Sequence, residues 1–195
     1  MNKIRRFFSL VPALILWLML SVLVWGFVFT RITDTDPAHK ITLFVDAEVT
    51  DATALAVRLE EKLGGNIRMA KVHPFNYAML DGSPLRAADL FIIRADHMET
   101  YQDWLLPLPE PLSGMEGEYV SRDISWGLLA YNAEIKSGVA ADCINYQPLG
   151  EPAADYYLCF GNQSRHIRTQ PDAVDNAAAD TAAILMNEGS SGNGG

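Results

Sequence analysis

The chain has 195 residues, of which 49% are apolar and 20% charged, and its formal net charge is −9. Residues 1–31 hold four basic side chains and no acidic one. The remaining 11 basic and 24 acidic side chains therefore give residues 32–195 a net charge of −13. So acidic a body repels phosphate backbones, which excludes general nucleic-acid binding. The apolar content excludes global disorder.

The first predicted element is a long apolar helix. The 24 residues from Phe7 to Thr30 include no charged side chain and would form roughly 36 Å of helix, more than the ~30 Å hydrocarbon core of a bilayer. The alternative is a cleaved signal peptide, whose apolar stretch is typically about 7–15 residues long. We therefore expect residues 1–31 to be a cytoplasmic stub and a single transmembrane helix. Basic residues before the run predict a cell-membrane protein with its N-terminus in the cytoplasm and its body outside.

The body begins with strands separated by helical patterns. In chain order we expect a linker over 32–40, a strand over 41–45, a helix over 51–63, strands over 67–72 and 89–93, and a helix over 98–106. This order predicts parallel strands, with the strand over 41–45 in the middle.

The later signals are different. Apolar runs predict strands over 126–131 and 155–160, an irregular segment lies between them, and an alanine-rich stretch predicts a helix over 172–186. The fold class is therefore α/β: a three-layer domain over 41–187 with a mostly parallel sheet, followed by a flexible tail over 188–195.

The chain has two cysteines, and a body outside the cytoplasm would favour a disulfide between them, because thiols tend to oxidise there. A disulfide between Cys143 and Cys159 would close a loop of about 17 residues and contribute roughly 3 kcal/mol in the chain-entropy model. The alternative is two unrelated buried thiols. We expect the disulfide and no metal site, because neither cysteine has a second Cys or His at ligand spacing.

Four segments resemble a known family: ITLFVDAE, IRMAKVHPF, ADLFIIRADH and SWGLLAYN, within residues 41–132. Together they are similar to the first lobe of the extracellular solute-binding proteins of ABC importers, with the second lobe missing or much reduced. The resemblance implies a small polar solute and the importer's membrane subunits as partners. A transmembrane helix would replace the lipidated cysteine that is common in that family.

Polar and aromatic side chains follow the predicted strands, where open parallel sheets bind ligands. The candidate ligand-binding residues are Asp46, Glu48, His73, Phe75, Asn76, Tyr77, Asp96, Trp126 and Tyr131, with Arg94 and His97 beside Asp96. Such a mixed rim suits a small polar ligand. Each residue also has an ordinary explanation: Asp46 as a helix cap, Asn76 in a turn, Phe75 in the core.

Signals for catalysis are weak, so we expect no enzyme and no cofactor. The sequence has no serine-hydrolase elbow, zinc-protease helix or P-loop. His39 and His166 lie in polar stretches and are expected at the surface. Two functions remain: a membrane-anchored extracytoplasmic binding or accessory module, or a structural or protein-interaction subunit of a membrane complex that binds no solute.

Overall fold

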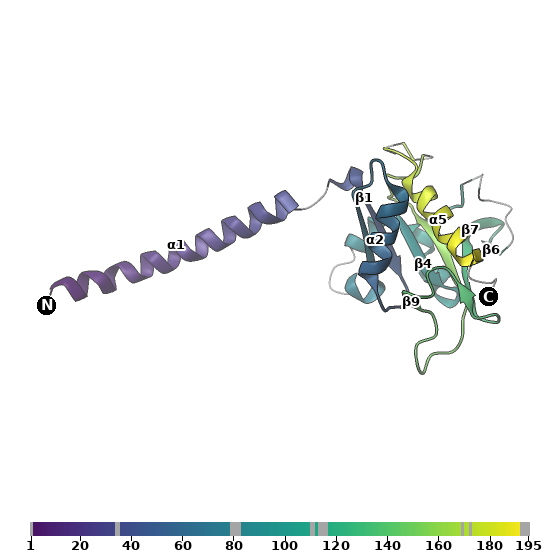
Figure 1. The fold of residues 1–195 in the computed structure, drawn as a ribbon, viewed down its shortest axis with the longest axis horizontal. Helices are drawn as coiled ribbons and strands as arrows, with labels where there is room; N and C mark the ends of the chain where they lie inside the picture. The colour runs from purple at the N-terminus through teal and green to yellow at the C-terminus, as the bar shows by residue number, and fades with distance from the viewer. Residues whose placement is uncertain are drawn as a thin grey trace. The chain divides into compact units, whose positions relative to one another are not determined.

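A computed structural model describes residues 2–33, 36–78, 83–109, 112, 117–168, 170–171 and 173–191 of the chain. The chain divides into two units, residues 1–36 and 37–195. The first unit is the helix α1 (Asn2–Thr33), with Pro12 inside it. The second unit holds the strands and all the other helices of the described chain (Figure 1).

The predicted membrane anchor is not supported. Among the described residues, no helix is long and apolar enough to cross a membrane. This finding counts against the transmembrane helix and against the single-pass localisation that we inferred from it.

The predicted parallel core is confirmed. The strand β1 (Lys40–Val45) lies between β3 (Met69–Pro74) and β4 (Leu90–Arg94) and is parallel to both. The helix α2 (Ala52–Leu63) connects β1 to β3. The Asp51 side chain caps its first turn by accepting a hydrogen bond from the Ala54 amide at 2.8 Å.

The other half of the sheet is antiparallel, so the prediction of a mostly parallel sheet is wrong. The sheet has eight strands, with β3, β1, β4, β10, β7 and β6 in that spatial order. Every pairing of β10 and β7 in it is antiparallel. The strands of this half are β10 (Tyr156–Gly161), β7 (Ile124–Asn132), β6 (Glu118–Ser121), β5 (Leu105–Leu106) and β8 (Ser137–Gly138). A separate antiparallel pair joins β2 (Glu48–Val49) to β9 (Ile144–Asn145).

Strand alternation divides the core between the two faces of the sheet. Leu43 and Val45 point to the face covered by α2 and α5 (Ala177–Ser191), while Phe44 points to the other face. Arg58 of α2 and Glu188 of α5 form an ion pair at 3.4 Å. The second face is covered by short elements: η2 (Phe75–Ala78), α3 (Ser83–Arg86), η3 (Ala95–His97), α4 (Met98–Tyr101) and η4 (Gln102–Trp104). One more turn, η1 (Pro37–His39), precedes β1.

The predicted disulfide is wrong, because the sheet separates the two cysteines. Cys143 packs on the α2 and α5 face, whereas Cys159 in β10 packs on the opposite face against Met98, with its Sγ 3.7 Å from the Met98 Sδ. Both are free and buried. Burial raises the pKa of each thiol. The alternative to the disulfide, two unrelated buried thiols, is therefore correct.

Candidate functional site

The connections that follow β1 and β4 leave the sheet on opposite faces. After β1 the chain enters α2, whose Leu55 and Leu59 pack on one face; after β4 it enters α4, whose Met98 packs on the other. Adjacent parallel strands with this arrangement form a topological switch point, where open α/β sheets bind ligands. A cavity of about 400 Å³ lies there. We call it the switch-point cleft; its lining includes Asp46, Glu48, Phe75, Asn76, Arg94, His97 and Glu151.

Within the switch-point cleft, Asp46, which follows β1, contacts His97, which follows β4. The His97 Nδ1 lies 2.6 Å from the Asp46 Oδ2, which also accepts a hydrogen bond from the Arg94 amide at 3.3 Å. The Asp46 amide donates to the Ile92 carbonyl at 2.8 Å. Burial raises the pKa of Asp46 and outweighs the lowering effects of His97 and the Arg94 amide. The cleft therefore holds a largely buried carboxyl group whose charge is only partly compensated.

Arg94 is the buried cation of the cleft, and three acceptors surround its guanidinium. Its Nη1 donates to the Glu151 Oε2 at 2.6 Å and its Nη2 donates to the Pro152 carbonyl at 3.0 Å. The Nε lies 2.9 Å from the Asp96 Oδ1 in an ion pair that lacks hydrogen-bond geometry. These contacts fasten the loop at 148–152 to the end of β4. Arg94 is thus neutralised by groups of the protein itself.

The remaining walls are one acidic and one aromatic surface. The Glu48 Oε2 accepts a hydrogen bond from the Asn145 Nδ2 at 2.7 Å, across the β2–β9 pair. The Phe75 ring stands edge-on to Tyr101, with ring centres 5.0 Å apart. Asn76 is exposed beside it. Carboxylates and an aromatic side chain thus line the same cleft.

Five of the predicted ligand-binding residues meet at the cleft or its rim. Asp46, Glu48, Phe75 and Asn76 line it, and Asp96 contacts its Arg94. Tyr77 lies in η2, and its side chain falls outside the described part of the chain.

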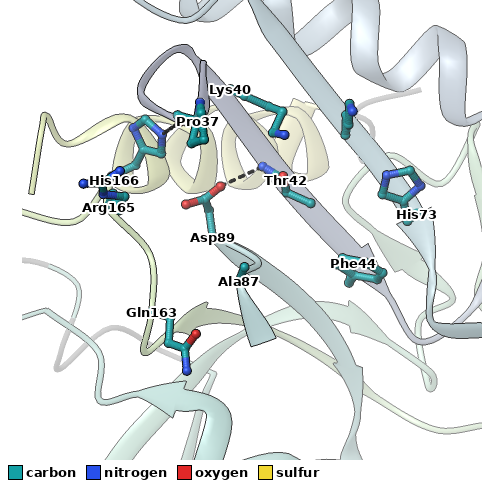
Figure 2. A pocket seen from close by; sticks show the side chains of 11 residues that line it. Pro37, Lys40, Thr42, Phe44, His73, Ala87, Asp89, Gln163, Arg165 and His166 are labelled. Carbon is teal, nitrogen blue, oxygen red and sulfur yellow. Dashed lines mark hydrogen bonds between the residues drawn. The ribbon is translucent and has the colours of Figure 1, made fainter. Parts of the chain in front are cut away.

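The other predicted residues lie elsewhere. His73 is still inside β3, opposite Phe44, and lines a different cavity. The Trp126 Nε1 donates to the Ser121 carbonyl at 3.3 Å, within the β6–β7 hairpin. Tyr131 stacks on Tyr146 with ring centres 4.4 Å apart and is buried. Packing in the sheet accounts for Trp126 and Tyr131, whereas His73 faces that other cavity (Figure 2).

Glu151 is the cleft residue that the sequence did not suggest. It lies in the irregular segment between β9 and β10, and its contact with Arg94 spans 57 positions of sequence. The only available signal was Arg94 itself, a charged residue at the end of an apolar strand that requires an acidic partner when buried. Among the described side chains, no group of His, Cys, Asp and Glu residues is arranged to hold a metal ion.

No protein-family model matches this chain, and no curated protein or solved structure matches it either. The expected resemblance to solute-binding proteins therefore gains no support and loses none. The case for a function rests on the geometry of the described residues.

Proposed function

We propose that the α/β unit is a binding domain that takes a small polar molecule with a positively charged group into the switch-point cleft. The observation that carries this proposal is the largely buried Asp46 carboxyl group in a cavity at the switch point. A volume of about 400 Å³ lies in the range of small-molecule sites, which are commonly about 300–1,000 Å³.

The charges of the lining favour a cation. Glu151 and Asp96 carry two negative charges against the one positive charge of Arg94, and Asp46 and Glu48 add two further carboxyl groups to the described lining. Burial disfavours the ionised form of Asp46, and a bound ammonium group would offset that cost. Phe75 also lines the cleft, and the face of an aromatic ring attracts a cation.

The test uses the full chain and titrates it with ethanolamine, putrescine and arginine, with acetamide and acetate as uncharged and anionic controls. We expect at least one of the ammonium compounds to bind and the controls to fail. Asp46→Asn keeps the shape and the hydrogen-bond acceptor but loses the charge, so it should weaken binding at least tenfold, or about 1.4 kcal/mol. Isothermal titration calorimetry measures binding to the parent chain and to Asp46→Asn.

Asp123→Asn is the matched control, because it removes the same charge from a residue that is exposed in the β6–β7 turn. If Asp46 only stabilises the fold, Asp46→Asn will lower the free energy of unfolding and leave the ligand bound. If none of the ammonium compounds binds, the domain is an interaction module without a solute and the proposal is wrong.

A further inference from the structure

One wall of the switch-point cleft is an irregular segment that contacts Arg94. Residues 148–152 lie in the connection between β9 and β10, and Pro148 and Glu151 line the cleft. Residues 149–153 are all exposed, and the large apolar side chain of Leu149 is completely so. This part of the connection therefore packs little against the core. We call residues 148–152 the strap.

The strap is a tight turn that is held by its own backbone. The Glu151 amide donates to the Pro148 carbonyl at 3.2 Å. Gly150, the third residue of the turn, has a φ of 93°, whereas Leu149 has no positive φ. This combination is typical of a type II turn, which favours glycine at the third position. The strap therefore keeps its shape without support from the rest of the chain.

Arg94 fastens this turn to the end of β4. Both hydrogen bonds that join the strap to the rest of the described chain come from its guanidinium, one to the Glu151 Oε2 at 2.6 Å and one to the Pro152 carbonyl at 3.0 Å. The Arg94 side chain is only 8% exposed, whereas that of Glu151 is 53% exposed. The strap can therefore leave Arg94 without disturbing the core, and water would then reach the guanidinium.

One donor of Arg94 is left unsatisfied while the strap is in place. Its Nε is buried and has no hydrogen-bond partner, because the Asp96 Oδ1, at 2.9 Å, lies outside hydrogen-bond geometry. A buried donor without an acceptor costs free energy, and hydration removes that cost. The unsatisfied Nε therefore favours the open position of the strap, while Glu151 and Pro152 favour the closed one.

We infer that the strap is a gate of the switch-point cleft, closed in this structure by the contact between Arg94 and Glu151 and opened when that contact breaks. The inference rests on the proposed function, because it concerns how a small cation enters and leaves the same cleft. Opening moves Pro148 and Glu151 out of the lining and leaves Asp46 at the end of β1. The gate controls the rates of ligand exchange, whereas Asp46 determines whether the ligand binds.

The reaction of Arg94 with p-hydroxyphenylglyoxal, a reagent for arginine side chains, measures opening without any ligand. Peptide mass spectrometry of the full chain at low extents of modification gives the rate at Arg94 relative to that at Arg122, which is exposed in the β6–β7 turn. In the parent chain we expect Arg94 to react more slowly than Arg122. Glu151→Gln removes the ion pair and should raise the relative rate at Arg94 at least about threefold.

Gly150→Ala tests the gate without changing a charge. Alanine is disfavoured at the positive φ that this turn requires, so Gly150→Ala should also raise the relative rate. Glu61→Gln makes the same chemical change as Glu151→Gln in α2, outside the cleft, and should leave the rate unchanged. If Arg94 reacts as slowly in Glu151→Gln and Gly150→Ala as in the parent chain, the inference is overturned.

Cys159 distinguishes opening of the gate from unfolding of the whole unit. Its thiol is fully buried in the sheet, so a thiol reagent should leave it unlabelled while Arg94 reacts. If the variants label Cys159 as fast as they expose Arg94, the faster reaction reflects unfolding and the gate is wrong.

Ligand kinetics separate this inference from the proposed function. If putrescine binds in the cleft, NMR line shapes should show that Gly150→Ala speeds its association and its dissociation by a similar factor and changes its Kd less than about twofold. Equal rates in the two chains would overturn the gate and leave the binding site intact. If no ammonium compound binds, the proposed function is wrong, and the rates at Arg94 still decide whether the strap opens.

Discussion

His166 should make the stability of the α/β unit depend on pH. Its side chain is 1% exposed, and both ring nitrogens face acceptors: the Asp175 carboxylate and the Pro37 carbonyl. Both acceptors are satisfied together only when both nitrogens carry a proton, so this arrangement favours the imidazolium. Burial lowers the pKa of His166, but the hydrogen bond to Asp175, the charge of Asp89 and the Pro37 carbonyl outweigh it, and the net pKa is raised.

The sign of the effect follows from linkage. A histidine whose pKa is higher in the folded state stabilises the fold fully below its unfolded value of 6.5, and this contribution is lost as the pH rises through the folded pKa. A hydrogen bond to a charged group contributes about 1.5–3 kcal/mol. We therefore expect His166→Gln to lower the free energy of unfolding by about 2 kcal/mol at pH 6 and by less at pH 9.

Urea unfolding at pH 6, 7, 8 and 9 in phosphate-free buffers checks this prediction. The quantity to follow is the difference in the free energy of unfolding between the parent chain and His166→Gln. Asp175→Asn serves as the partner variant, because it keeps the acceptor that caps Ala177 but removes the charge that holds the imidazolium. A difference that stays constant from pH 6 to pH 9, or that grows with pH, would refute the reasoning.

Two further predictions concern the core. A Cβ on Gly161 would lie 2.0 Å from the Ala88 carbonyl oxygen, so Gly161→Ala should lower the free energy of unfolding by at least about 2 kcal/mol. Gly26→Ala, where a Cβ meets nothing within 4 Å, should leave the free energy of unfolding unchanged. Equal melting temperatures of the Gly161→Ala and Gly26→Ala chains would contradict this prediction. Because Cys143 and Cys159 are buried with raised thiol pKa values, neither should react with a thiol reagent until the protein is denatured, and fast labelling of the native chain would be the contrary result.

The parallel half of the sheet was accessible from the sequence because its signals are local. The apolar runs over 41–45 and 89–93 need cover on both faces, and the crossover rule then orders the strands. The helix α2 follows from its leucine spacing and its cap at Asp51. Each of these inferences uses residues within one element and its neighbours.

The antiparallel half depends on pairings that no local pattern specifies. The β6–β7 turn uses Arg122 and Asp123, both with positive φ (53° and 62°), where glycine or asparagine would have marked a hairpin. The strand β10 pairs with β4 across more than 60 positions, which the crossover rule does not address. The disulfide between Cys143 and Cys159 was predicted wrongly for a similar reason, because the sequence does not show which face of the sheet Cys159 occupies.

The site was predicted in part for a similar reason. Asp46 and Glu48 follow β1 directly, so their position at the sheet edge could be inferred, whereas Glu151 comes from an irregular loop. His166 was expected at the surface because its neighbours are polar, yet it is buried. A polar side chain is tolerated there because each of its nitrogens has a partner, and composition does not reveal such partners.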